Sequence, residues 1–307
     1  MHRGLIFAAA AAPALCVFAQ SDSPATFRSD TRLVVLHVTV ADRAGRLLTD
    51  LPASSFSVYE NGVAQPIRSF KREDVPVSMG LVVDNSASMR DKRAKVEAAA
   101  MVLVKASNPN DEVFVVNFND EAFLDLPHGK QFTNNLAELQ EALARIDARG
   151  STAMRDAIRM SIDHEQAYAH KDKKVLVVVT DGDDNNSDIN LENLLQMAQR
   201  SEVLIYPIGL LAQEGRSDAR RAERALKALA AATGGEPFFP KDLGEVDRIA
   251  NQVAREIRSQ YTIVYTPLNT AMDGAYRQVK VAVNAFGKLV VRTRSGYFAT
   301  DAVHPTK

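Results

Sequence analysis

The sequence predicts an α/β fold in which an open, mostly parallel, doubly wound sheet is inserted into a small antiparallel β-sandwich-like module. Between residues 75 and 258, short apolar stretches alternate with stretches of helical periodicity, which is typical of a parallel sheet with helices on both sides. The regions on either side are rich in β-branched residues and turn signals. Neither is long enough to bury a core alone, so we expect the two to pair with each other.

The composition excludes several classes of protein. The chain has 307 residues, of which 46% are hydrophobic and 24% charged, and this is ordinary for a globular protein rather than a disordered one. The formal net charge is -1, whereas a dedicated nucleic-acid or membrane-surface binder needs a basic excess. The length suggests roughly two domains at about 150 residues each.

The N-terminus predicts a secretory signal peptide. Arg3 precedes an uncharged, Ala-rich stretch over residues 4–19 that ends in small residues, so we expect cleavage after Ala19. The stretch is short for a membrane span, which needs about 20 apolar residues, although an uncleaved anchor helix is the alternative. Lipidation of Cys16 is disfavoured by the preceding Leu15. Cleavage would give a secreted or periplasmic chain without cysteine, disulfides or a membrane span.

The first β block has clear strand and turn signals. Residues 33–40 are mostly β-branched and predict a strand. Asn61-Gly62 predicts a two-residue hairpin turn, because both positions tolerate positive φ. We expect the strand over 65–70 to return beside the strand over 56–59.

The middle region predicts four parallel strands and the helices between them. Residues 175–179 are all apolar, as expected for a central strand that is buried on both faces. The other predicted strands cover 77–83, 113–118 and 203–208. Apolar residues at helical spacing place helices at about 91–106, 136–146, after 152, 191–198, 220–232 and 246–257.

The chain returns to β structure after residue 258. Strands are predicted over 261–265, 278–283 and 288–293, with residues 285–287 as a hairpin tip between the last two. The expected organisation is a signal peptide (1–19), a flexible leader (20–31), the β module in two parts (32–72 and 259–299), the α/β domain (75–258) and a tail (300–307).

Polar side chains gather where the predicted strands end, which is where open α/β sheets bind ligands. Asp84, Ser86 and Ser88 follow the first strand of the sheet, Thr152 opens a helix and Asp181 follows the central strand. Two carboxylates and three hydroxyls are hard oxygen ligands. This donor set suits Mg²⁺ or Mn²⁺ rather than zinc or copper.

Over about residues 75–258 the sequence resembles the von Willebrand factor type A domain, whose three metal-site segments occur here in the family's order. The resemblance implies metal coordination through the hydroxyls of Ser86, Ser88 and Thr152, and by Asp84 and Asp181 directly or through water. Residues 56–62 and 294–298 also resemble a bacterial secreted family, the VWFA-related acidobacterial proteins. The resemblance then spans nearly the whole mature chain.

The resemblance implies a function in adhesion, in which the metal bridges two proteins. A divalent cation held by this donor set is incompletely neutralised and keeps an exchangeable water, which an Asp or Glu of a partner protein can displace. We therefore expect a secreted, non-enzymatic protein-binding module. One alternative is a Mg²⁺-dependent hydrolase that uses the same rim, although no general base is evident there. The other is a structural scaffold in an envelope assembly.

Other polar clusters in the sequence have ordinary explanations. Asp183, Asp184 and Asp188 with Asp181 could hold a second cation, but a solvated loop is the favoured interpretation. Asn117 and Asp120 could shape the rim or form a turn.

A zinc site and an anion site are both disfavoured. His164 and His170 are six residues apart, about 120° around a helix, whereas the zinc-protease helix needs histidines four residues apart. Acidic residues interrupt the basic cluster, which favours a solvated helix face; its arginines are Arg216, Arg220, Arg221 and Arg224.

Overall fold

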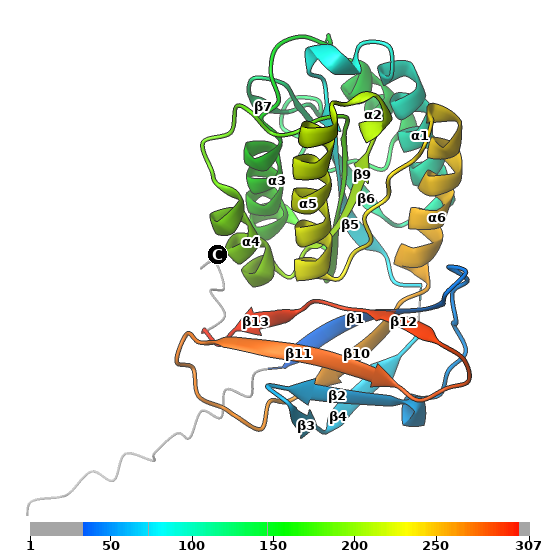
Figure 1. Cartoon of the computed structure of the whole chain (residues 1–307), viewed down its shortest axis with the longest axis vertical. Helices are drawn as coiled ribbons and strands as arrows, with labels where there is room; N and C mark the ends of the chain where they lie inside the picture. Colours follow the sequence, from blue (N-terminus) through cyan, green and yellow to red (C-terminus); the bar gives the residue numbers. More distant parts are fainter. Residues whose placement is uncertain (1–32, 73, 146, 301–307) are drawn as a thin grey trace, which may run out of the picture. The chain divides into compact units, whose positions relative to one another are not determined.

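The computed structural model describes residues 33–72, 74–145 and 147–300, which form an α/β domain and a β module (Figure 1). The predicted signal peptide, the leader and nearly all of the tail lie outside the described residues. Ile146, which the sequence places in a helix, also lies outside them.

The α/β domain is built on a five-stranded sheet with the order β7-β6-β5-β8-β9. Four strands are parallel: β5 (Val77–Asp84), β6 (Glu112–Phe118), β8 (Lys173–Thr180) and β9 (Leu204–Gly209). The short edge strand β7 (Ala122–Leu124), whose apolar stretch of three residues is too short to predict a strand, is antiparallel to β6. Every residue of β5 and β9 is buried, because helices cover both faces of the sheet.

Within the described residues, six α-helices cover the two faces. They are α1 (Arg93–Ala106), α2 (Leu136–Ala144), α3 (Met154–Tyr168), α4 (Leu191–Ser201), α5 (Arg216–Thr233) and α6 (Val246–Arg258). Helix α1 packs against α2 and α6, and α4 packs against α3 and α5, which gives one group on each side (Figure 1). The predicted doubly wound sheet is confirmed. Among the described helices, none is both long and apolar enough to cross a membrane.

The β module consists of two four-stranded antiparallel sheets, with the orders β12-β1-β10-β4 and β13-β11-β2-β3. The strands from the first block are β1 (Val34–Asp42), β2 (Phe56–Glu60), β3 (Val63–Gln65) and β4 (Ile67–Lys71). Those from the second are β10 (Tyr261–Tyr265), β11 (Tyr276–Val283), β12 (Leu289–Arg292) and β13 (Gly296–Phe298). Each sheet contains strands from both blocks, so the two parts of the chain build one core, as the predicted sandwich requires. Short 3₁₀ helices complete the fold: η1 (Ala53–Ser55), η2 (Ala87–Met89), η3 (Leu211–Gln213) and η4 (Leu243–Glu245).

The predicted turn at Asn61-Gly62 is confirmed, but the returning strand is only partly right. Asn61 and Gly62 have φ of 47° and 82°, and β2 and β3 pair directly across them. The strand predicted over 65–70 is divided at Pro66. Only β3 pairs with β2, whereas β4 pairs with β10 in the other sheet. Proline has no N–H to donate, so a continuous ladder would be interrupted at this position.

Two further predictions in the β module and the helices are wrong in detail. Residues 285–287 are not a hairpin tip, because β11 pairs with β2 and β13 whereas β12 pairs with β1. This segment therefore crosses from one sheet to the other. Helix α5 begins at Arg216 rather than Arg220. Its first turn is polar, so apolar periodicity does not detect these residues as helical.

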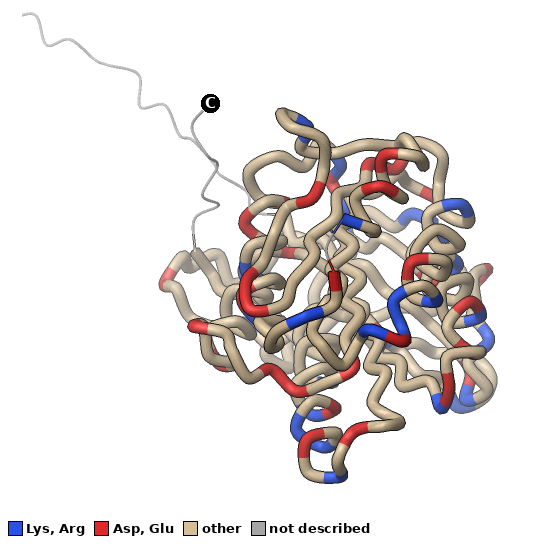
Figure 2. Tube along the Cα trace, turned by 90° about the horizontal axis from the view of Figure 1, so that it is seen from above, with Lys and Arg blue, Asp and Glu red and all other residues tan. Residues whose placement is uncertain are grey.

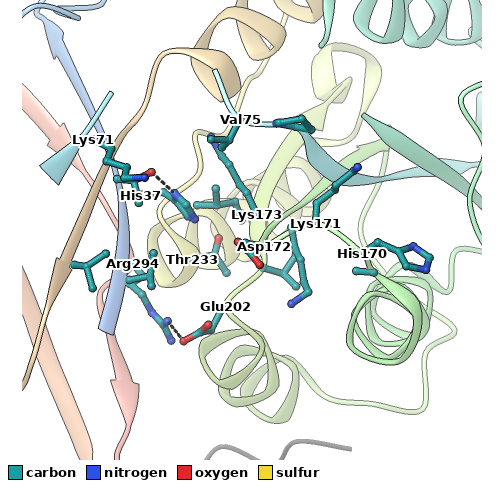
Figure 3. A pocket seen from close by; sticks show the side chains of 18 of the residues that line it. His37, Lys71, Val75, His170, Lys171, Asp172, Lys173, Glu202, Thr233 and Arg294 are labelled. Carbon is teal, nitrogen blue, oxygen red and sulfur yellow. Dashed lines mark hydrogen bonds and ion pairs between the residues drawn. The ribbon is translucent and has the colours of Figure 1, made fainter. Parts of the chain in front are cut away.

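A cleft of about 780 Å³ lies between the two modules (Figure 3). It is at the amino ends of the parallel strands, whereas the predicted site is at their carboxyl ends. Strands β1, β4 and β10 line one side, and the segments that lead into β8 and β9 line the other. Its buried cations already have partners: Lys173 donates to the Ile257 carbonyl and Arg294 pairs with Glu202. Burial and these two cations lower the pKa of His37 to about 3, so His37 is neutral. Lys173 and Arg294 thus serve to join elements of the fold.

Replacing Arg294 with alanine is expected to lower the free energy of unfolding by about 2–3 kcal/mol. Its buried guanidinium donates to the carbonyls of Gln199 and Gly296 at 2.6 and 3.0 Å and to Glu202 at 3.1 Å, and the carbonyls would lose this donor. Urea denaturation measures the change. Lys280→Ala, at an exposed position on β11, is the control, and an equal effect of both variants would contradict the role of Arg294.

Candidate metal centre

The site begins with the two carboxylates at the ends of neighbouring strands. Asp84 ends β5 and Asp181 follows β8, and these strands pair in parallel, so both side chains lie at the same edge. Both residues are 0% exposed. The Asp84 carboxylate accepts hydrogen bonds from the Ser86 amide at 2.7 Å and the Thr180 hydroxyl at 2.6 Å. Its position is therefore fixed by the two strand ends.

The two serines connect this strand end to Asp181. The hydroxyls of Ser86 and Ser88 are 3.1 Å apart, and the Ser88 hydroxyl donates to Asp181 Oδ1 at 2.8 Å. Four of the five predicted ligands, Asp84, Ser86, Ser88 and Asp181, thus lie in one chain of contacts.

Thr152 lies in a neighbouring loop that is bound to the serine loop. The Arg149 amide donates to the Asn85 carbonyl at 2.9 Å, and the Ala87 amide to the Gly150 carbonyl at 3.2 Å. Thr152 itself is buried, and its amide donates to Asn185 Oδ1 at 2.9 Å. In the described part of the chain, no hydrogen bond joins its hydroxyl to the other four side chains. Thr152 is therefore next to the network but is not hydrogen-bonded into it.

Asp120 holds the loop that carries Thr152. Its carboxylate accepts a hydrogen bond from the Ser151 amide at 2.8 Å. Gly150 has φ of +73°, and a Cβ there would lie 2.1 Å from Asp120 Oδ2. Of the two interpretations of Asp120, the contacts favour a role in shaping the rim.

Gly150→Ala is expected to lower the free energy of unfolding by about 1–3 kcal/mol, because it combines a left-handed backbone with a clash against Asp120. Chemical denaturation measures the loss. Gly182→Ala, on the same rim, is the control because its Cβ would meet nothing within 4 Å. Equal stability of the two variants would contradict this account of the loop.

Asn85 and Asn117 form the buried base of the site. Both are 0% exposed, and Asn85 Nδ2 donates to Asn117 Oδ1 at 2.8 Å. Asn117 in turn donates to Asp125 Oδ2 at 2.7 Å. Sequence reasoning noticed Asn117 but not Asn85, which lies between the predicted ligands Asp84 and Ser86.

Lys92 is the charged residue of the site that the sequence analysis missed. Its ammonium group contacts Asp181 Oδ2, and the residue is only 7% exposed. It precedes α1, where a cation opposes the helix dipole. That unfavourable placement four residues after Ser88 is the one signal in the sequence that could have drawn attention to it.

The donor set fits a hard divalent cation. Among the described residues, no group of three or more His, Cys, Asp or Glu could hold a metal, so an ion here depends on the hydroxyls. The Lys92 contact shows that Asp181 Oδ2 accepts a positive charge. Burial raises the pKa of Asp84 to about 6, against the hydrogen bonds from Thr180 and Ser86 that lower it. A nearby cation would favour its ionised form.

The surroundings of the rim carry both signs of charge. Viewed from above, acidic and basic residues are interspersed over the loops and helix ends (Figure 2). In the acidic loop, Asp183 pairs with Arg221 at 2.7 Å and Asp184 with Arg155 at 2.9 Å. Arginines therefore already pair with two of the acids in this loop, which favours the solvated-loop interpretation over a second cation site.

The two histidines do not form a metal site. His164 lies inside α3, with Nε2 2.9 Å from the Gln131 carbonyl and its ring 4.5 Å from that of Phe114. His170 lies beyond the end of α3, and its Nδ1 is 3.0 Å from Glu112 Oε2. The zinc-protease arrangement is therefore absent from these two positions.

Comparison with known proteins places the α/β domain in a family. Residues 79–252, more than half of the 307-residue chain, match the von Willebrand factor type A domain. An uncharacterised protein of Synechocystis sp. is 27% identical over 117 residues. That match covers 37% of this chain and 27% of the relative, so the chain spans only about a quarter of the relative's length.

Two solved structures align with the chain at low identity. A von Willebrand factor type A protein from Catenulispora acidiphila aligns with a TM-score of 0.53 and 15% identity, covering 90% of this chain and 76% of that one. The vWF domain of a type V pili tip protein from Porphyromonas gingivalis aligns with a TM-score of 0.48 and 14% identity, covering 60% of this chain and 97% of that one. At 15% identity the Catenulispora structure shows the fold alone. By the match over residues 79–252, the chain belongs to the von Willebrand factor type A domain family.

Proposed function

We propose that this chain is an exported, non-enzymatic protein-binding module that captures a carboxylate of a partner protein through a divalent metal ion. The observation that carries the proposal is the connected set of oxygen donors Asp84, Ser86, Ser88 and Asp181 at the edge of the sheet. Membership of a family that typically serves in adhesion supports the same function.

The hydroxyl and carboxylate side chains of the rim would coordinate the ion, Mg²⁺ or Mn²⁺, in different ways. Ser86, Ser88 and Thr152 would hold it through their hydroxyls, and Asp84 and Asp181 directly or through water. Ser88 is exposed whereas both carboxylates are buried, so the open side of the site faces solvent at the serine. When bound, the ion supplies an electrophilic position with exchangeable water, which a partner's Asp or Glu can occupy.

The hydrolase alternative lacks a proton acceptor in contact with the ligands. Such an enzyme needs a general base beside the metal. Among the described residues, Lys92 is the further titratable side chain that an ion pair or hydrogen bond joins to the five predicted ligands, whereas Glu214 interacts with Asp181 through longer-range electrostatics. The Lys92 ammonium group is paired with Asp181 and has no lone pair to accept a proton. The contacts therefore favour binding over catalysis.

A capture experiment tests the proposal. The chain from Gln20 onward, without the predicted signal peptide, is used as bait for exported and envelope fractions of the source cell, with Mg²⁺ or with EDTA. A protein retained only with Mg²⁺, and lost with Asp84→Asn, is the expected result. Glu121→Gln is the control, because it removes an exposed carboxylate from the neighbouring loop and leaves the donor network intact.

Two other results would contradict the proposal in different ways. Capture that is indifferent to Mg²⁺ and to Asp84→Asn would move the interface to the β module, as the scaffold alternative requires. Metal-dependent turnover of a phosphoester or peptide, abolished by Asp181→Asn, would establish the hydrolase instead.

A further inference from the structure

We propose that Lys92 is a built-in cation that competes with the divalent ion for Asp181 and so limits how tightly the rim binds metal. This inference rests on the proposed function, because it concerns the regulation of the same site. Its consequence is that the affinity for metal is set by an ion pair within the chain as well as by the ligands.

The contacts of Asp181 carry the inference. Asp181 is 0% exposed, and its two oxygens have different partners: Oδ1 accepts from the Ser88 hydroxyl at 2.8 Å and Oδ2 contacts the Lys92 ammonium. The Lys92 side chain is only 8% exposed, so solvent screens the pair weakly. A cation that binds Asp181 Oδ2 must displace the ammonium group or remain beside it against charge repulsion.

The position of Lys92 shows that the ion pair, rather than the helix, holds its side chain. Lys92 is the residue before α1, and its carbonyl accepts from the amides of Lys95 and Val96. A positive charge at a helix N-terminus is disfavoured by the helix dipole. The side chain therefore has no local reason to stay at this end, and Asp181 is the partner that compensates.

A second carboxylate, that of Glu214, lies in the neighbourhood of this ion pair. Glu214 lies just beyond η3 and interacts electrostatically with both Asp181 and Lys92. Metal binding at Asp181 would therefore allow Lys92 to move toward Glu214 without being left unpaired in a poorly solvated place.

Removing the competing charge tests the inference. Titration of the purified chain with MgCl₂ by calorimetry is expected to show about tenfold tighter binding for Lys92→Met than for the unaltered chain. In EDTA the same variant is expected to unfold at lower urea concentration, because buried Asp181 loses its counter-ion, and Mg²⁺ should reverse this loss. Lys95→Met is the matched control: it lies three residues further on and pairs with Asp247 on α6 instead. It should leave the Mg²⁺ affinity unchanged within about twofold.

Labelling of the unaltered chain gives a second readout that does not depend on a variant folding. Reductive methylation followed by mass spectrometry is expected to modify Lys92 slowly without Mg²⁺ and several-fold faster with it, as the ammonium group leaves Asp181. Exposed Lys241 is the reference and should react equally in both conditions.

Each outcome separates this inference from the proposed function. If both proteins bind Mg²⁺ equally, or Lys92→Met binds it more weakly, the competition is wrong and the metal site stands. The same holds if Mg²⁺ binds but Lys92 labelling does not change. If only Lys92→Met binds Mg²⁺, the competition is supported and the proposed function is wrong. If neither protein binds Mg²⁺, both proposals fail.

Discussion

Asp84→Asn is expected to weaken Mg²⁺ binding about 100-fold while leaving the fold intact. Asparagine keeps the size of the side chain. Its Oδ1 can still accept from the Ser86 amide, and its Nδ2 can donate to the Thr180 hydroxyl, which reverses the direction of that hydrogen bond. The substitution removes one of the two carboxylate charges at the rim. Since hydroxyls carry no charge, this loss halves the negative charge that the five side chains offer to a cation.

Calorimetric titration with MgCl₂ measures the effect of Asp84→Asn, and circular dichroism checks that the fold is kept. Asp91→Asn is the matched control, because Asp91 is an exposed carboxylate in the same loop. An equal loss of affinity in both variants would show that the total negative charge of the loop, rather than the position of Asp84, attracts the ion.

The sequence predicts the carboxylates of the site well because they are defined by strand ends. Apolar runs mark β5 and β8, parallel strands end at one edge, and the polar residues that follow must then lie close together. Lys92 could not be predicted in the same way. Its partner Asp181 is 89 residues away, and neither that contact nor the burial of Lys92 leaves a periodic signal in the sequence.

The fold shows the same division between local and non-local information. Strands that are buried on both faces are continuous apolar runs, so β8 is evident from the sequence. Pairing in the β module depends on which sheet each strand joins. A short link over 285–287 can close a hairpin or cross between sheets, and local turn chemistry does not distinguish these cases. The edge strands β7 and β13 are three residues each, too short to show alternation.

Glu165→Gln is expected to make the chain more stable by about 2–4 kcal/mol at pH 8, with a much smaller effect at pH 4.5. Glu165 lies in α3 and is 0% exposed, and neither of its carboxylate oxygens has a hydrogen-bond partner among the described residues. Burial raises its pKa to about 8, although the charge of Lys174 lowers it. The buried group is therefore tolerated as the neutral acid and costs stability when it ionises.

The direction of the pH dependence of Glu165 follows from linkage. The pKa in the folded chain lies above its value in the unfolded chain, which is about 4.3. Its contribution is therefore fully present below that value and is lost as the pH rises through about 8. Glutamine stays neutral throughout, so the stability advantage of the variant should grow over this range.

Urea denaturation of the unaltered chain and of Glu165→Gln, at pH 4.5, 6 and 8, measures this difference. Other buried groups also titrate: the pKa of Glu256 is raised to about 8 by burial, so the variant keeps some pH dependence of its own. That contribution is common to both proteins and cancels in the comparison, since Glu256 lies on α6 and Glu165 on α3. Glu141→Gln, on the exposed face of α2, is the control and should show no such trend. A stability difference that stays constant from pH 4.5 to 8 would mean that Glu165 ionises without cost, and that its carboxylate reaches water or a cation in the folded chain.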